Sequence, residues 1–183
     1  VVTNRHSIRK FNEDKLISFN SFSKMLSVFK QIKEDNKIRC YYASAGGLYP
    51  VDIYIYIKKD RVENLSEGIY YYNPQSNSLQ LVNSNAAINN KSYYYSNKEI
   101  FDSSAFSIFM IYNAKANMPK YKSLGYLYAA LDAGIMVSLF TNVAESLDAG
   151  VCSIGDLKFS EIENEFKLDK DQIWLHTIEV GLK

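Results

Sequence analysis

Apolar residues follow two different periods along the first half of the chain. Between residues 14 and 32, large apolar side chains recur at helical spacing, which predicts an early helix. Side chains of two kinds alternate along residues 51–58, a period of two that predicts a strand. Shorter apolar runs at 69–72 and 79–82 flank an Asn-Pro turn, so residues 51–82 together predict a β-meander.

The second half of the chain is dominated by one strand and one long helix. The continuous apolar run 106–112 is typical of a strand that is buried on both faces. Residues 123–147 predict the longest helix, with Ser123 as its N-cap and with Gly134 in its interior, where a neighbour is expected to pack closely. The side chains predicted to face the core from this helix are Leu124, Leu127, Tyr128, Leu131, Ile135, Leu139 and Val143.

Less regular segments complete the pattern. The polar segment 83–98 predicts a loop or a short helix, 150–155 a short strand or loop, 160–166 a short helix, and 173–180 a final strand. No internal repeat and no linker rich in Pro or Gly interrupts the chain, so residues 1–183 predict a single domain. Helices mixed with a meander indicate the α+β class.

Composition narrows the function classes. A net charge of +1 argues against a dedicated nucleic-acid binder, and no run of about 18 apolar residues predicts a membrane span. Two cysteines, Cys40 and Cys152, predict neither a disulfide framework nor a metal site. No basic segment followed by an apolar one stands after Val1, so a cytoplasmic domain is expected. The 15 Tyr and 10 Phe residues fit half-buried strands, and a minority could line a flat aromatic ligand.

The first motif with chemical potential is Arg5-His6-Ser7-Ile8-Arg9. Two guanidinium groups and a hydroxyl within five residues form a compact anion site, because Arg binds phosphate through two parallel hydrogen bonds. A solvated polar segment near the N-terminus is the alternative.

The second motif is Ser44-Ala45-Gly46-Gly47, which stands just before the predicted strand 51–58. Four small residues leave backbone N–H and C=O groups open to the edge of a planar heterocycle. The pattern differs from the glycine-rich loops of the common nucleotide folds. A tight turn before a strand explains it equally well.

The third motif is Pro119-Lys120-Tyr121, predicted to lie in a loop that Pro119 closes. The positive end of the following helix favours the deprotonated forms of Lys120 and Tyr121, which suits a general base. Adjacent side chains usually point apart, so both can face one ligand only if the backbone is irregular near Pro119. A surface lysine beside a packed tyrosine is the alternative. His176 is expected to be structural, and no triad or metal-ligand pattern occurs.

Taken in order, the motifs resemble the FMN-dependent nitroreductase superfamily in its azoline-dehydrogenase (SagB-type) branch. The resemblance rests on R-x-S-x-R, SAGGLYP, GIYYYNP, FDSSAFSIF, Lys-Tyr, AALDAG and VCSIG, which extend from Arg5 to Gly181. The sequences SAGGLYP and GIYYYNP are most similar to those of the oxidase domains of thiazole-forming nonribosomal peptide synthetases. Two departures are Asp132 in place of a glutamate and Lys122 in place of a glycine.

This resemblance implies an α+β nitroreductase-like fold, with a mostly antiparallel sheet flanked by helices, in a homodimer that holds FMN between its subunits. It implies flavin contacts from Arg5, His6, Ser7, Arg9, Ser44, Ala45, Gly46, Gly47, Ile154 and Gly155. It implies that Lys120 and Tyr121 abstract a proton. No metal is expected, because the Asp and Glu residues are scattered without a metal-ligand pattern. Many relatives place a second basic cluster on the flavin phosphate, for which this chain offers only Lys183.

The activity that the resemblance implies is FMN-dependent oxidation of a thiazoline or oxazoline to the aromatic azole. The substrate would be a peptide on a carrier domain, and dioxygen would reoxidise the flavin. Two alternatives stay open: an NAD(P)H-dependent nitro or quinone reductase, and a flavin-free domain that docks carrier domains. The Lys-Tyr pair argues against the reductase, because hydride transfer from a nicotinamide needs no base.

Overall fold

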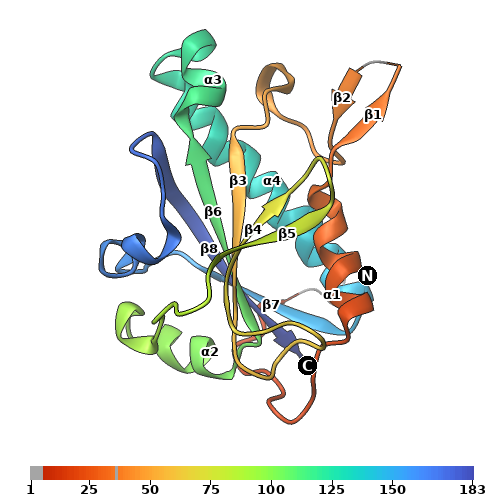
Figure 1. The fold of residues 1–183 in the computed structure, drawn as a ribbon, viewed down its shortest axis with the longest axis vertical. Helices are drawn as coiled ribbons and strands as arrows, with labels where there is room; N and C mark the ends of the chain where they lie inside the picture. Colours follow the sequence, from red (N-terminus) through yellow and green to blue (C-terminus); the bar gives the residue numbers. More distant parts are fainter. Residues whose placement is uncertain (1–5, 36) are drawn as a thin grey trace.

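The computed structural model describes residues 6–35 and 37–183 and shows a six-stranded antiparallel sheet with helices on both faces (Figure 1). The strand order is β5-β4-β3-β6-β8-β7, so the consecutive strands β3, β4 and β5 form the predicted meander. The sheet strands are β3 Val51–Ile57, β4 Gly68–Asn73, β5 Ser78–Asn83, β6 Phe106–Asn113, β7 Ala149–Ile154 and β8 Gln172–Leu182, and a separate hairpin pairs β1 Ile32–Glu34 with β2 Lys37–Arg39.

The helices form two layers around the sheet. The α-helices are α1 Phe19–Leu26, α2 Asn97–Ser103, α3 Ala114–Tyr121 and α4 Leu124–Ser146, and the 3₁₀ turns are η2 Ser27–Phe29, η3 Ala45–Gly47, η4 Asn90–Ser92, η5 Phe159–Glu161 and η6 Glu163–Phe166. Residues of α1 and α4 share one apolar core with one face of the sheet, and α2, η5 and η6 share a second core with the other face. The predicted α+β class, with a mostly antiparallel sheet flanked by helices, is therefore confirmed.

The central strand β6 behaves as the apolar run predicts. It lies between β3 and β8, and every residue from Phe106 to Tyr112 is buried. Alternate side chains enter the two cores, so the strand has no polar face.

The early helix is shorter than predicted. It spans only Phe19–Leu26, because Ser18 caps its first turn by accepting from the Ser21 N–H at 3.1 Å. After η2 the backbone becomes extended at Lys30 and continues into β1. The predicted helix 160–166 is likewise replaced by the two 3₁₀ turns η5 and η6.

The long helix α4 has the predicted bounds, but it buries a different face. Its buried side combines small residues, such as Ala129 and Ala133, with the larger Met136 and Phe140. Most of the large aliphatic side chains predicted to face the core are instead exposed, because the small residues allow α4 to lie close to the sheet. The exposed fractions are 52% for Leu124, 53% for Leu127, 57% for Leu131 and 43% for Ile135.

Two smaller predictions about α4 find no support within this chain. Gly134 lies on the exposed side, and an added Cβ would have no neighbour from the chain itself within 4 Å. Ser123 precedes the helix with helical backbone angles, and its side chain forms no capping hydrogen bond.

Among the described residues, α4 is the one helix that is long and apolar enough to cross a bilayer. Its hydropathy has a local explanation, because one side contributes to the core and the buried Asp132 bonds to Ser44. Both cysteines are free and buried.

A buried polar cluster occupies the core between β8 and α2. The fully buried Glu179 accepts hydrogen bonds from the hydroxyls of Tyr93, Ser104 and Ser107 at 2.7, 2.6 and 2.9 Å. Burial raises its pKa. Lys58 donates to backbone carbonyl oxygens of α2, and burial lowers its pKa to about 8 while Glu179 partly opposes this shift.

The lowered pKa of Lys58 predicts a pH-dependent stability. Between the folded pKa of about 8 and the ordinary lysine pKa of 10.5, the unfolded chain binds more protons, so the free energy of unfolding rises with pH. Below pH 8 the burial penalty is fully present. Lys58→Met should remove this pH dependence. Relative to the variant, the free energy of unfolding of the wild type should therefore rise by at most ~1.4 kcal/mol per pH unit. Urea unfolding at pH 7, 8 and 9 measures the difference.

The exposed neighbour Lys59 provides the control. Lys59→Met should leave the pH slope of stability as in the wild type. Equal slopes for the wild type and Lys58→Met would show that Lys58 keeps its proton in the folded state.

Candidate active site

The structure brings together two predicted motifs that are far apart in the sequence. A Cβ added at Gly46 would lie 2.5 Å from the Tyr121 hydroxyl and 2.7 Å from the Lys120 amine. Any side chain at position 46 would therefore displace both polar groups. Gly46 also has a φ of 63°, which favours glycine independently.

The position of the Lys-Tyr pair differs from the prediction. Pro119 does not close a loop but lies inside α3, which runs to Tyr121, and the irregular residue is Lys122 with a φ of 50°. The pair therefore ends one helix as well as preceding another. The two side chains nevertheless converge, with the Lys120 amine 5.1 Å from the centre of the Tyr121 ring.

Neighbouring residues fix the orientation of this pair. The Tyr121 ring packs edge-on against Tyr128, with ring centroids 4.9 Å apart. The buried Asn117 joins α3 to α4, because it accepts from the Tyr112 hydroxyl at 2.7 Å and donates to the Gly125 carbonyl at 2.9 Å. The Lys-Tyr pair therefore lies at the junction of α3 and α4, which these contacts hold in place.

The segment 44–47 presents its backbone outward. Gly46 and Gly47 are both exposed and both have positive φ, and a Cβ at Gly47 would meet nothing within 4 Å. The 3₁₀ turn η3 therefore offers main-chain groups rather than side chains to a ligand. This geometry fits the edge of a flat heterocycle, as the motif predicts.

A buried carboxylate holds this segment on α4. The Ser44 hydroxyl donates to Asp132 Oδ2 at 2.5 Å and accepts from the Tyr49 N–H at 2.9 Å. Burial raises the pKa of Asp132, and the bonds from Ser44 and the Ala45 N–H oppose that shift. The Ser44 side chain is thus engaged by groups of the protein itself, and it positions Gly46 and Gly47.

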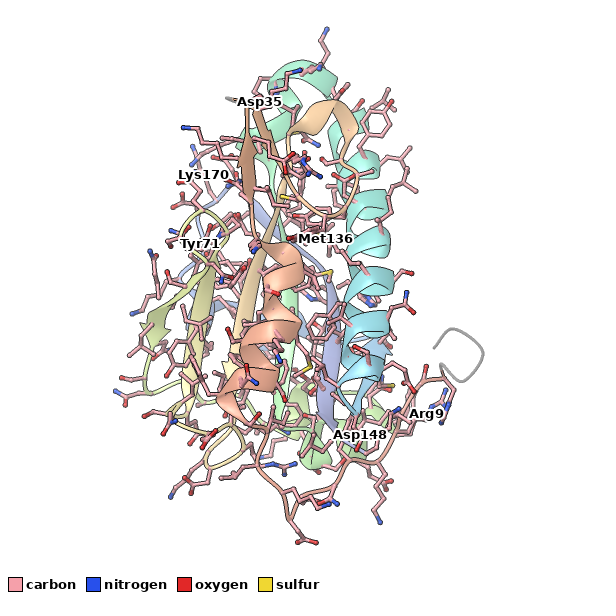
Figure 2. All side chains as sticks on the ribbon, turned by 90° about the vertical axis from the view of Figure 1, so that its right-hand side faces the viewer. Arg9, Asp35, Tyr71, Met136, Asp148 and Lys170 are labelled. Atoms are coloured by element: carbon pink, nitrogen blue, oxygen red, sulfur yellow. The ribbon has the colours of Figure 1, made fainter. Side chains whose placement is uncertain are left out.

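The N-terminal motif lies at the other end of α4. Figure 2 shows Arg9 and Asp148 near the C-terminal end of this helix, with Met136 midway along it. The Ile8 N–H donates to the Val151 carbonyl at 3.1 Å, which fixes the motif on β7. His6 and Arg9 are exposed, Ser7 is half-buried, and Arg5 lies outside the described residues.

Lys183 is brought to this same end of the helix. Its amine lies 2.5 Å from Glu145, and this bond lowers the Glu145 pKa, with a further contribution from His6. Arg9 opposes the rise that burial causes in the Cys152 pKa. Cationic groups from both termini thus gather around the end of α4.

Ile154 and Gly155 stand where β7 ends. The Ile154 side chain is fully buried in the second core, so only its backbone is available to a ligand. Gly155 is exposed, and an added Cβ would meet nothing within 4 Å.

Apart from Ile154 and Gly155 at the end of β7, the described site residues therefore form two groups rather than one. Lys120, Tyr121 and the segment 44–47 lie along the first half of α4, whereas His6, Ser7 and Arg9 lie beyond its end. The helix rise places Asp132 and Glu145 about 20 Å apart.

Sequence reasoning did not identify Asn117, expected Tyr128 only in the core-facing stripe of the long helix, and recorded Asp132 only as a departure from the family pattern. The signal for Asp132 was a lone carboxylate within an apolar helix, because such a group needs a buried partner.

Among residues 6–35 and 37–183, no group of three or more His, Cys, Asp or Glu side chains is placed to hold a metal ion. The two groups of site residues are thus made of cations, main-chain groups and the Lys-Tyr pair.

Comparisons with known proteins agree with this architecture. The microcin B17-processing protein McbC of Escherichia coli is 25% identical over 143 residues, which cover 75% of this chain and 52% of McbC. The chain thus spans about half the length of this curated relative. The E. coli microcin synthetase McbBCD complex with truncated pro-MccB17 bound matches with a TM-score of 0.80 at 21% identity, over 98% of this chain and 71% of the other.

A second solved structure, assigned as a nitroreductase from Ralstonia eutropha JMP134, has a TM-score of 0.77 at 15% identity, over 99% of this chain and 80% of that one. At these identities the structural likeness establishes the fold. The model of the nitroreductase family matches residues 2–182, nearly the whole chain. The chain is therefore a member of the nitroreductase family.

Proposed function

We propose that this chain is an FMN-dependent oxidase that converts a peptide-bound thiazoline or oxazoline into the aromatic azole. The observation that carries the proposal is that the Tyr121 hydroxyl and the Lys120 amine occupy the space that a Cβ at Gly46 would take. It combines a backbone surface for a planar ring with two groups that exchange protons. The similarity to McbC, a peptide-processing protein, supports a peptide substrate.

The residues fit both ends of FMN, the ring system and the phosphate. Main-chain groups of Ser44, Ala45, Gly46 and Gly47, with the backbone at Ile154 and Gly155, would hold the ring system. Arg9, Ser7, His6 and Arg5 would hold the phosphate, and Lys183 lies close enough to join them. FMN supplies the hydride acceptor when it is bound.

Lys120 and Tyr121 take the proton in this reaction. Aromatisation of the ring removes two hydrogen atoms: the Cα proton goes to the base, and the Cβ hydrogen leaves as hydride with both electrons. The two groups form one unit beside Gly46, so one accepts the proton while the other stabilises it. Dioxygen is the proposed final acceptor of the two electrons.

A second copy of the chain would complete the site. The exposed residues Leu124, Leu127, Leu131 and Ile135 form an apolar stripe on α4. A two-fold axis across this stripe would pack two α4 helices antiparallel, so that the start of one helix would lie beside the end of the other. The phosphate-binding group of one subunit would then approach the Lys-Tyr group of its partner.

The proposed function is tested by colour and by turnover. Purified protein should be yellow, should release FMN on denaturation, and should remove two hydrogen atoms from a carrier-bound thiazoline peptide, measured as a mass loss. Colourless protein that binds a carrier domain would support the docking alternative instead. Rapid flavin reduction by NAD(P)H, without azoline turnover, would support the reductase.

Arg9→Ala should weaken FMN binding by about tenfold or more, because one charge-assisted contact with a phosphate contributes roughly 1.5–3 kcal/mol. Riboflavin lacks the phosphate, so it should bind the wild type and the variant equally. Titration of the apoprotein with each flavin measures both affinities. Arg39→Ala, which removes an exposed arginine on β2, is the control. Unchanged FMN affinity in Arg9→Ala would place the phosphate elsewhere.

A further inference from the structure

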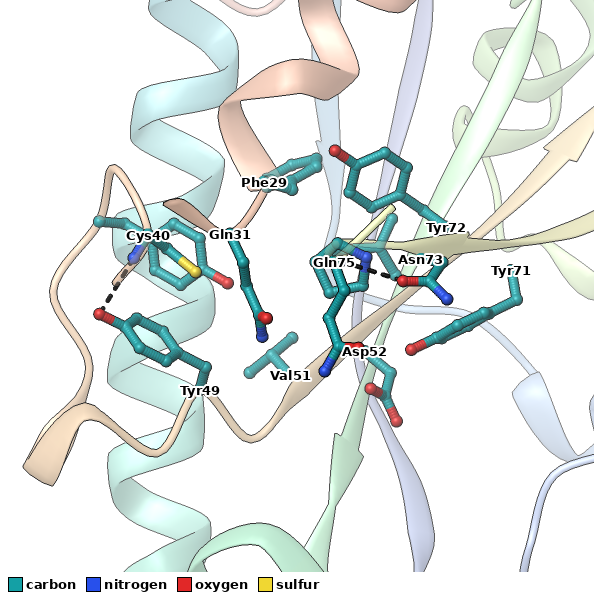
Figure 3. A pocket seen from close by; sticks show the side chains of 13 residues that line it. Phe29, Gln31, Cys40, Tyr49, Val51, Asp52, Tyr71, Tyr72, Asn73 and Gln75 are labelled. Atoms are coloured by element: carbon teal, nitrogen blue, oxygen red, sulfur yellow. Dashed lines mark hydrogen bonds between the residues drawn. The ribbon is translucent and has the colours of Figure 1, made fainter. Parts of the chain in front are cut away.

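A cavity of about 260 Å³ opens at the end of the sheet where β3 begins (Figure 3). Its walls come from the segment after η2, the segment around η3, the start of β3 and the turn between β4 and β5. None of the predicted site residues lines it. A cavity of this size is too small for a flavin and large enough for one amino-acid side chain.

Asp52 is the one charged side chain among the described residues of the cavity wall. Its Oδ2 atom accepts from the Gln172 side-chain amide at 2.9 Å and from the Asn113 amide at 3.2 Å. Its Oδ1 atom accepts no hydrogen bond from the described residues, and it is not sealed from solvent. One carboxylate oxygen is thus held in place while the other is available to a ligand.

Aromatic residues form much of the remaining cavity wall. Phe29, Tyr42, Tyr49, Tyr71 and Tyr72 all line the cavity. Figure 3 shows the Tyr71 hydroxyl turned toward the Asp52 carboxylate at the edge of the space.

A cavity whose one charged group is a carboxylate with a free oxygen selects a cation, because that oxygen can form a charge-assisted hydrogen bond with it. An anion would be repelled, and an apolar group would leave Asp52 desolvated without a partner.

The cavity adjoins the candidate active site on two sides. Tyr49 follows Gly47 by two residues, so their Cα atoms are at most ~7.6 Å apart. Asn113, which binds Asp52, immediately precedes α3, and Lys120 lies seven residues further, about 10 Å along that helix. An extended peptide covers this distance in about three residues.

We propose that this cavity binds the cationic side chain of a lysine or arginine in the peptide substrate, about three residues from the azoline ring. The inference rests on the proposed function for the identity of the substrate. It makes Asp52 a specificity residue that selects peptides with a basic residue near the ring. The azoline itself stays at the Lys-Tyr pair.

Turnover provides the first test. Two thiazoline peptides are compared, identical except for lysine or norleucine three residues before the ring. The wild type should show a KM about tenfold lower for the lysine peptide. Asp52→Asn should make the two KM values equal with flavin content unchanged. Asp60→Asn, an exposed aspartate beyond the other end of β3, should keep the preference. A wild type without preference, or a preference that survives Asp52→Asn, overturns the proposal.

Binding provides a second test that does not depend on azoline chemistry. N-acetyl-lysine methylamide should shift the NMR signals of the Val51 and Ile53 methyl groups, which line the cavity, and N-acetyl-norleucine methylamide should not. Gln75→Lys, which adds a cation at the exposed rim, should abolish the shift. If no peptide turns over but the shift is seen, the proposed function fails and the cation site stands. If turnover occurs without any shift, the cation site fails alone.

Discussion

Tyr121→Phe and Lys120→Ala should each reduce azoline oxidation by about 10²–10⁴-fold while FMN stays bound. This factor is the typical contribution of a positioned general acid or base. Both polar groups lie within 3 Å of the position of a Cβ at Gly46, so they face the proposed flavin-binding segment. Neither substitution removes buried packing, because Tyr121 keeps its ring against Tyr128. Loss of two hydrogen atoms from a carrier-bound thiazoline, followed by mass spectrometry, measures the rate.

Matched controls separate chemistry from local structure. Lys122→Gly changes the next lysine to the residue that its backbone angles, φ 50° and ψ −133°, favour, and Tyr41→Phe removes an exposed hydroxyl elsewhere. Both should turn over like the wild type. Flavin reduction by dithionite should be unaffected in all four variants, because it bypasses the substrate proton. Wild-type turnover in both Tyr121→Phe and Lys120→Ala would make the pair structural and remove the main support for azoline oxidation.

Leu131→Asp should convert a dimer into a monomer and release FMN. Leu131 lies in the middle of the exposed stripe on α4 and is 57% exposed in the single chain. Burial of one leucine contributes about 1.5–3 kcal/mol, and two-fold symmetry counts it twice, so the dissociation constant should rise by at least ~100-fold. Light scattering measures the mass, and absorbance of the protein after gel filtration measures the retained flavin.

Leu81→Asp is the control for this charge, because Leu81 is 56% exposed on the edge strand β5, away from α4. It should leave both mass and flavin content unchanged. A stable wild-type monomer that retains FMN would refute the shared site. The dimer is expected to bury upwards of about 2,000 Å², as obligate interfaces do.

Local patterns determined most of the strands and the ends of the long helix. The meander and the doubly buried strand β6 follow from runs of β-branched and aromatic residues separated by turns. The motif residues Gly46, Lys120 and Tyr121 were also identified, because unusual chemistry in a short stretch is visible in the sequence alone. Local signals are less reliable where a cap competes with periodicity, as Ser18 does at the start of α1.

Tertiary structure alone decided which face of α4 is buried and how the motifs combine. The helix α4 is apolar on two sides, and hydrophobicity alone predicts that the side with the larger residues is buried. In the structure the side with Ala129 and Ala133 packs on the sheet, because small residues permit a closer approach. The separation of Arg9 from Lys120 likewise depends on the direction of α4 through the molecule, which no local spacing encodes. The sequence by itself therefore determined the chemistry available to this protein, and the packing of one helix against one sheet decided where that chemistry meets, because contacts between distant segments depend on the whole fold.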